Sequence, residues 1–182
     1  MSPVTAGRGS RSLNLLNVFS RRFAPMPTAL EDVREFLARR RIALVGLSRD
    51  PKDFSRLLFR ELYQRGYDMV PVNPAAAELE GRRCFARVQE ISPPPDGVLL
   101  MTAPRETERV VRDCAQAGVR RVWMHRGGGQ GAVSQDAADF CRQQGMHLVE
   151  GYCPLMFLSR TSLVHRVHGF ILRLLKRYPC AE

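Results

Sequence analysis

The feature that most constrains the fold of this chain is a regular alternation of short apolar segments with longer amphipathic segments that end at glycine. Apolar residues recur at helical spacing in the amphipathic segments. Glycine ends a helix well because it adopts left-handed backbone angles without steric cost. The predicted helices cover residues 28–40, 53–65, 106–117 and 134–144, with stops at Gly66, Gly118 and Gly145. Strands that alternate with helices of about 10 to 15 residues indicate a parallel sheet with crossover connections.

The apolar segments between these helices are the predicted strands. They are the stretches IALVG, YDMVPVNP, DGVLLMTAP, VRRVWMHRGGG and MHLVEGYCP. Their nearly continuous apolar character is expected where helices cover both faces of a sheet. We therefore predict an α/β fold: a doubly wound, Rossmann-like parallel sheet of about five strands flanked by helices. Between Glu78 and Ile91 the pattern predicts only a short strand near Cys84 and a helical turn.

The domain organisation follows from the same pattern. With 182 residues, the chain has room for one domain with a sizeable core. We predict that this domain spans residues 28–158 and begins with Thr28 as a helix cap, with Glu31 three positions later. Residues 1–27 contain arginine and serine but no acidic residue, as transit peptides and disordered leaders do, and we expect a disordered extension.

Residues 159–182 are predicted to form a basic amphipathic helix. Its apolar stripe consists of Leu163, Val164, Val167, Phe170, Ile171, Leu174 and Leu175. We expect this stripe to pack against the domain or to mediate a homodimer or partner-protein contact; docking on an anionic membrane is the alternative. The two histidines of the segment, His165 and His168, are too few for a metal site.

The amino-acid composition argues against several classes of function. The net charge of +10 comes almost wholly from arginine, since Lys52 and Lys176 are the only lysines. These arginines are scattered and are not interleaved with stacking aromatics, so we expect no nucleic-acid binding. The five cysteines show no C-x-x-C pairing, which is typical of reduced thiols in a cytoplasmic protein. No apolar run approaches the roughly 20 residues that cross a bilayer, and we expect no membrane association.

Ligands of doubly wound sheets bind beyond the carboxyl ends of the strands, so the loops there carry the functional information. After the first predicted strand, Gly46 is followed by Leu47, Ser48 and Arg49 instead of the G-x-G-x-x-G turn that holds a dinucleotide. The second strand ends in Asn73 and Pro74, without the acid that usually binds the NAD ribose. Both absences argue against a standard NAD site.

The first loop remains suited to phosphate. Gly46 permits a close backbone turn, Ser48 carries a hydroxyl, and the helix that begins near Asp53 directs its free N–H groups toward the loop. Positive charge comes from Arg49, Lys52 and Arg56. The plain alternative is a strand-to-helix turn surrounded by solvated cations, and the residues alone leave both interpretations open.

Several of these segments together resemble a known family. The stretches IALVGLSRDPKDFSRLLFRELYQRGYDMVPVNP, CFARVQEISPPPDGVLLMTAP, AGVRRVWMHRG and GYCP resemble the small bacterial CoA-binding domain proteins, which are related to the CoA-binding domain of the succinyl-CoA synthetase alpha subunit. The resemblance covers about residues 28–158 and implies coenzyme A or acyl-CoA as the ligand. By position it implies a site made of Gly46, Leu47, Ser48, Arg49, Asn73, Pro74, Thr102, Ala103, Pro104, His125, Arg126 and Gly127. Lys52, Ser55 and Arg56 complete the predicted binding set.

Two departures from the family pattern matter. The synthetase has a lysine shortly after its second strand, where this chain has three alanines at 75–77, so an arginine of the first loop has to compensate. The segment MHRGGGQG adds a glycine-rich loop, which either cradles phosphate through backbone amides or is simply a loop.

No catalytic set is predicted. His125 lies at the end of a strand but has no identifiable partner, and we expect it to bind ligand or to serve the structure. Cys153 precedes Pro154 at a predicted helix start, which could lower its thiol pKa, although we expect a structural role. The expected function is a non-catalytic, cytoplasmic carrier, sensor or accessory subunit of acyl-CoA metabolism. The alternatives are an NAD(P)-binding oxidoreductase-like protein with an atypical loop and an adaptor that acts through its C-terminal helix.

Overall fold

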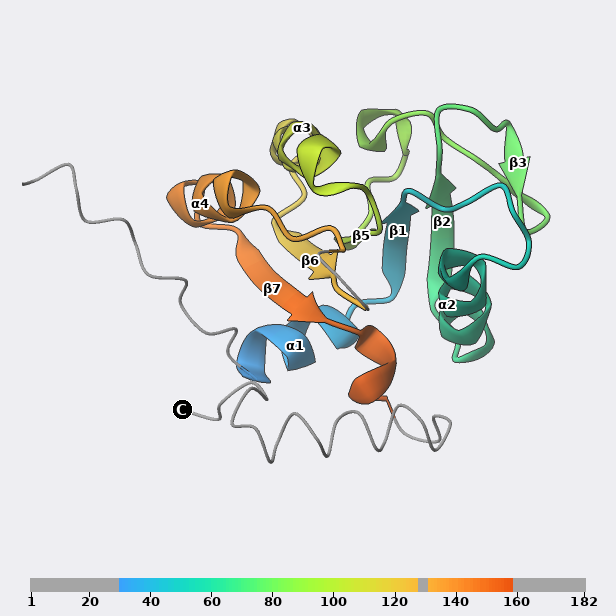
Figure 1. The fold of residues 1–182 in the computed structure, drawn as a ribbon, viewed down its shortest axis with the longest axis horizontal. Coiled ribbons are helices and arrows are strands. Elements are labelled where there is room, and N and C mark those ends of the chain that lie inside the picture. The colour runs from blue at the N-terminus through green and yellow to red at the C-terminus, as the bar shows by residue number, and fades with distance from the viewer. Residues whose placement is uncertain (1–29, 128–130, 159–182) are drawn as a thin grey trace, which may run out of the picture.

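A computed structural model describes residues 30–127 and 131–158 of the chain and shows an open α/β sheet with helices on both faces (Figure 1). The elements, in chain order, are α1 (Leu30–Leu37), β1 (Arg41–Val45), α2 (Phe54–Gln64), β2 (Asp68–Val72), β3 (Glu78–Leu79), β4 (Arg82–Arg83), η2 (Val88–Glu90), β5 (Gly97–Leu100), α3 (Pro104–Gln116), β6 (Arg121–His125), α4 (Gln135–Gln143), β7 (His147–Tyr152) and η3 (Pro154–Met156).

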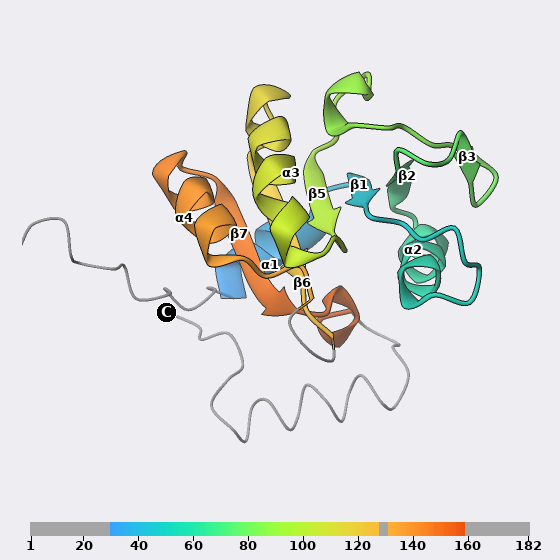
Figure 2. The ribbon, with the colours of Figure 1, turned by 45° about the horizontal axis from the view of Figure 1, so that its top comes forward.

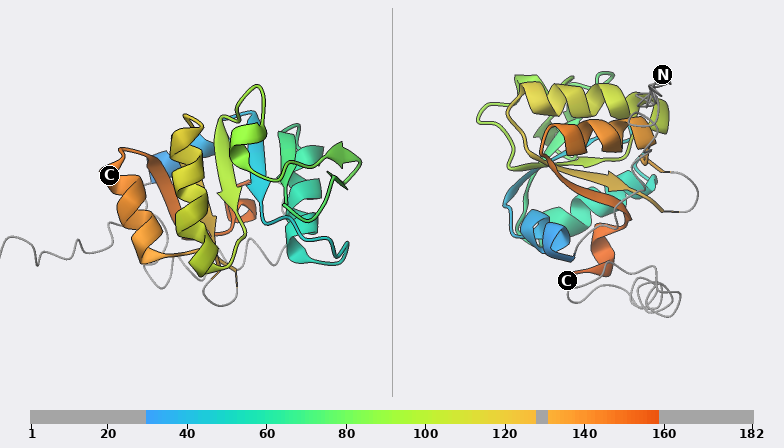
Figure 3. Two further views of the ribbon diagram at one scale, coloured as in Figure 1. Left: turned by 90° about the horizontal axis from the view of Figure 1, so that it is seen from above. Right: turned by 90° about the vertical axis from the view of Figure 1, so that its left-hand side faces the viewer.

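The main sheet confirms the predicted Rossmann-like fold. Its five strands are all parallel and lie in the order β2-β1-β5-β6-β7, so the strand order reverses between β1 and β5. Helices α1 and α2 cover one face and α3 and α4 the other (Figure 3). On their face α3 and α4 lie side by side (Figure 2). Each face buries its own apolar cluster, which explains why the strands are apolar on both sides.

The helix ends follow from caps and glycines. The Asp53 side chain caps α2 by accepting a hydrogen bond from the Ser55 N–H at 2.8 Å, and Gly66 ends that helix region with a φ of 88°. Two predicted boundaries were wrong: α1 ends at Leu37 instead of near Arg40, and α3 begins at Pro104 instead of Glu106. Proline fits the first position of a helix because its missing N–H has no partner there in any case.

The buried face of α2 differs from the predicted apolar stripe. The spacing in this segment predicts a stripe of Phe54, Leu57, Leu58 and Leu62, but Phe54 and Leu57 are 39% and 45% exposed. The helix buries the predicted Leu58 and Leu62 together with Phe59. The buried face also includes the small polar Ser55. A pattern of apolar residues alone therefore does not identify this face.

The connection from β2 to β5 contains a second, two-stranded sheet. Strands β3 and β4 pair as an antiparallel hairpin, and Phe85 extends β2 through a single parallel bridge with Val72. The predicted helical turn is η2.

Several predictions fall outside the described residues: the N-terminal extension at 1–27, the Thr28 cap, the basic helix at 159–182 and the centre of the glycine-rich loop at 128–130. No helix among the described residues is long and apolar enough to cross a membrane. Within residues 30–127 and 131–158, no three His, Cys, Asp or Glu side chains gather as metal ligands would.

Candidate functional site

Two cavities lie at the carboxyl ends of the strands and share Thr102, which follows β5 at the reversal of strand order. The first, the His125 cavity, has a volume of about 480 Å³ and is lined by Phe54, Met101, Thr102, Ala103, His125, Arg126, Gly127, Gly131, Ala132, Cys153 and Met156. The second, the β2 cavity, has about 260 Å³ and is lined by Val45, Gly46, Val72, Asn73, Pro74, Ala86, Arg87, Val88, Thr102, Glu106, Arg109, Val110 and Asp113.

The predicted site residues divide into three groups around these cavities. Gly46, Asn73 and Pro74 line the β2 cavity, while Ala103, His125, Arg126 and Gly127 line the His125 cavity and Thr102 lines both. The remaining residues, Leu47, Ser48, Arg49, Lys52, Ser55, Arg56 and Pro104, line neither cavity. Six residues of the His125 cavity were not predicted as ligand contacts: Phe54, Met101, Gly131, Ala132, Cys153 and Met156. Strand-end spacing alone could have indicated Met101.

Gly46 brings the first loop against the loop after β5. It has a φ of 88°, its N–H donates to the Val72 carbonyl at 3.1 Å, and a Cβ at this position would lie 2.8 Å from the Met101 carbonyl oxygen. The glycine is therefore required by contact between two protein backbones, a reason that sequence reasoning did not identify.

Ser55 and Arg56, at the start of α2, hold the backbone of the first loop through hydrogen bonds. The Ser55 hydroxyl oxygen accepts from the Ser48 N–H at 2.9 Å, and the serine donates in turn to the Asp53 carboxylate. Arg56 is 9% exposed, donates to the Ser48 carbonyl at 3.0 Å and pairs with Glu80. Since both side chains are already bonded within the protein, they position the loop.

Glu80 links this loop to the hairpin of β3 and β4. It pairs with both Arg56 and Arg60, and it has a φ of 55°, unusual for a residue with a side chain. Burial raises its pKa, but hydrogen bonds from Arg60 and Arg56 outweigh burial and hold the pKa below the ordinary value. The Glu80 carboxylate of the hairpin thus holds the Arg56 side chain in place against the first loop.

Three side chains of the first loop remain available to a ligand. Arg49 and Lys52 are exposed, and neither side chain has a hydrogen bond or ion pair within the described part of the chain. The Ser48 hydroxyl accepts from the Asp50 N–H at 3.1 Å, which leaves its own proton free to donate. The start of α2 offers less than predicted because the Asp53 carboxylate already occupies the Ser55 N–H.

Asn73 joins the first two loops. Its Nδ2 donates to the Leu47 carbonyl and its Oδ1 accepts from the Ala75 N–H, each at 2.8 Å. Leu47 is itself fully buried, so only its backbone faces the loop region. Asn73 therefore ties the loop after β1 to the loop after β2 and also lines the β2 cavity itself.

Thr107, in the first turn of α3, connects the loops after β5 and β6. It is fully buried, and its hydroxyl lies 2.9 Å from the Ala132 carbonyl and 3.0 Å from the Thr102 hydroxyl. It can donate to the first while accepting from the second. Thr107 thereby fixes Thr102, the residue common to both cavities.

We expect Thr107→Val to lower the free energy of unfolding by about 1 to 3 kcal/mol, because the Ala132 carbonyl and the Thr102 hydroxyl lose a buried partner. Thr107→Ser retains the hydroxyl and should lose less than half as much. Urea unfolding followed by circular dichroism measures both. A loss in Thr107→Val no greater than that in Thr107→Ser, which gives up only the methyl group, would show that the hydrogen bonds of the hydroxyl do not dominate the role of Thr107.

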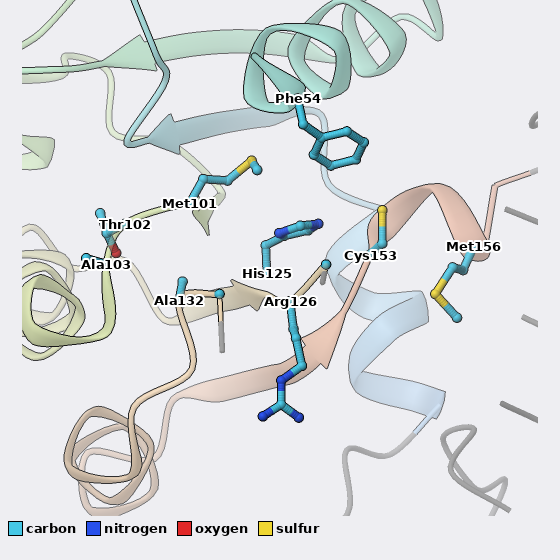
Figure 4. A pocket seen from close by; sticks show the side chains of 11 residues that line it. Phe54, Met101, Thr102, Ala103, His125, Arg126, Ala132, Cys153 and Met156 are labelled. Carbon is cyan, nitrogen blue, oxygen red and sulfur yellow. The ribbon is translucent and has the colours of Figure 1, made fainter. Parts of the chain in front are cut away.

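His125 forms one wall of its cavity. It is 5% exposed, its ring centre lies 5.5 Å from that of Phe54, and its Nε2 is buried with no hydrogen-bond partner among the described residues (Figure 4). Burial lowers the pKa of the imidazole to about 4, so it is neutral at pH 7. No described side chain is placed to act with this nitrogen as a general acid or base.

The glycine-rich loop closes tightly at its base. The Ala132 N–H donates to the His125 carbonyl at 2.8 Å, and a Cβ on Gly131 would lie 2.4 Å from that carbonyl oxygen. On the other side of the cavity, Cys153 is buried, and burial raises the pKa of its thiol to about 11. The idea of a helix-activated thiolate is therefore wrong, and the structural interpretation of Cys153 is supported.

Comparison with known proteins links this geometry to a family. Residues 40–159 match the family model described as CoA binding domain. The uncharacterized protein YneT of Bacillus subtilis is 27% identical over 123 residues, which cover 67% of this chain and 88% of that protein. The solved structure of a hypothetical protein from Pyrococcus horikoshii superimposes with a TM-score of 0.64 at 29% identity, over 78% of this chain and 91% of that one.

A larger protein shares part of the sequence. The alpha subunit of the ADP-forming acetate–CoA ligase II of Pyrococcus furiosus is 28% identical over 88 residues. The match covers 48% of this chain but only 19% of that subunit. The likeness thus concerns one segment of the ligase subunit.

Proposed function

Since the chain belongs to the CoA binding domain family, we propose that it binds coenzyme A or acyl-CoA and acts as a carrier, sensor or accessory subunit without catalysing a reaction itself. One observation carries the proposal: the loops after β1, β2, β5 and β6 surround two cavities that meet at Thr102, where the strand order reverses. Two neighbouring cavities that share Thr102 suit an elongated ligand with a nucleotide at one end and a thiol at the other.

The β2 cavity suits the nucleotide end. Valine side chains from β1, β2, η2 and α3 give it an apolar floor, as a nucleobase requires. Its two arginines, Arg87 and Arg109, both pair with Asp113, and Arg109 also pairs with Glu106, so two carboxylates balance the two positive charges. The phosphates would then meet Arg49, Lys52 and Ser48 of the first loop, which compensate for the alanines at 75–77.

Isothermal titration calorimetry with CoA, dephospho-CoA, NAD and NADP tests this function. We expect saturable binding of CoA with one ligand per chain, weaker binding of dephospho-CoA, and no heat from NAD. Saturable binding of NAD without any response to CoA would overturn the proposal.

A second prediction concerns the first loop and its contacts to the phosphates of CoA. Ser48→Ala combined with Arg49→Ala should weaken CoA binding about tenfold or more, because a hydroxyl contact and a charge-assisted contact to phosphate are lost together. Arg120→Ala is the matched control, since it removes one positive charge at the amino end of β6, on the opposite edge of the sheet. If the double variant binds CoA as tightly as the control does, the first loop does not hold the phosphates.

A further inference from the structure

The His125 cavity has a lining that the nucleotide and phosphates of CoA do not require. Apolar and sulfur-containing side chains enclose it from four directions (Figure 4). Phe54 comes from α2, Met101 from the loop after β5, Ala132 from the base of the glycine-rich loop, and Cys153 and Met156 from the turn at η3. Such a surface favours an apolar group of small to moderate size.

The described part of this lining offers little to a negative charge. Arg126 is its one cation among residues 30–127 and 131–158, and the Arg126 side chain extends away from the His125 ring and from Phe54 (Figure 4). Of the other described side chains in the lining, only those of Thr102 and His125 carry an oxygen or nitrogen atom. A carboxylate beside the His125 ring would lose its water without gaining a charged partner from the described residues.

His125 supplies an independent sign that a ligand belongs here. It is more than nine-tenths buried on the cavity wall, yet Nε2 has no partner within residues 30–127 and 131–158. Buried polar atoms in proteins are nearly always hydrogen-bonded, because an unmade hydrogen bond is costly. A neutral imidazole has one N–H group, and this group can donate a hydrogen bond to a carbonyl oxygen.

We propose that the His125 cavity binds the acyl group of a short-chain acyl-CoA whose chain carries no charge, with the His125 imidazole hydrogen-bonded to the thioester carbonyl. The inference rests on the proposed function, because it requires the nucleotide end in the β2 cavity and the thioester end beyond Thr102. It adds the class of acyl group and the residues that select it.

Calorimetric titration of the full chain with CoA, butyryl-CoA and succinyl-CoA tests the proposal. The two acyl groups have the same chain length and differ at the end of the chain, where one carries a methyl group and the other a carboxylate. We expect butyryl-CoA to bind at least about fivefold more tightly than CoA, from burial of its methylene groups. Succinyl-CoA should bind no more tightly than CoA.

Two variants of α2 locate the effect. Phe54→Ala removes a cavity wall and should reduce the preference for butyryl-CoA over CoA to within about twofold. Leu57→Ala is its matched control, because Leu57 is exposed on the same helix to a similar degree, 45% against 39% for Phe54, and does not line the cavity. It should retain the full preference.

The outcomes separate the two proposals. Three results would overturn the acyl assignment while leaving CoA binding intact. They are equal affinities for CoA, butyryl-CoA and succinyl-CoA, tighter binding of succinyl-CoA than of CoA, and a preference for butyryl-CoA over CoA that survives Phe54→Ala. If none of the three ligands binds, the proposed function and this inference fail together.

Discussion

Gly46→Ala lowers the free energy of unfolding by about 2 to 5 kcal/mol in our account, whereas Gly66→Ala lowers it by only about 1 to 2 kcal/mol. Both glycines have a φ of 88°, so an alanine at either position meets the same backbone strain. A Cβ at Gly66 has no atom within 4 Å, but a Cβ at Gly46 would lie 2.8 Å from the Met101 carbonyl oxygen. The difference between the two variants therefore measures the close contact of the two loops.

The Gly46 variant should also lose ligand affinity, because the Cβ pushes the first loop away from the Met101–Thr102 backbone at the junction of the two cavities. Chemical denaturation measures stability and calorimetry measures CoA binding in the same pair of variants. Equal losses of stability in Gly46→Ala and Gly66→Ala would contradict the contact between the loops.

Acidification from pH 6.5 to pH 4 should remove about 3 kcal/mol of stability through His125 alone. The pKa of His125 is lowered by burial from 6.5 to about 4 in the folded protein. Between these values the unfolded chain binds a proton that the folded chain does not, so unfolding is favoured as the pH falls. The full stability is present well above pH 6.5, where the imidazole is neutral in both states.

His125→Phe isolates this contribution, since it keeps an aromatic ring beside Phe54 and removes the titrating group. Unfolding free energies of the two proteins should diverge by about 3 kcal/mol between pH 6.5 and 4 as the native protein loses stability. Carboxylates such as Glu80, whose pKa lies below its ordinary value, titrate in both proteins and cancel in the difference. Parallel pH curves would show that the His125 ring is well solvated.

The fold could be predicted because its signals are local. Gly66, Gly118 and Gly145 each end a helix with positive φ, as their positions after amphipathic segments indicated. The buried face of α2 was mispredicted because Ser55 belongs to it and Leu57 does not. A helix buries the face that meets the sheet, and the position of the sheet is not a local property.

The site could be predicted only as a set of loops. Strand ends pointed to Gly46, Asn73, Thr102 and His125, and these residues line the two cavities, while their role in binding a ligand stays a prediction. The roles of their side chains depend on bonds between distant segments, such as the one from Asn73 to the Leu47 carbonyl, and these leave no periodic pattern in the sequence. For the same reason Thr107, which ties two loops together, could not be identified beforehand.

The most direct test of the central claim is native mass spectrometry of the full chain in an equimolar mixture of CoA, NAD and ATP. If the cavities at the carboxyl edge of the sheet form a CoA site, the chain will retain one CoA and neither of the other nucleotides. Retention of NAD or ATP in place of CoA would contradict the account.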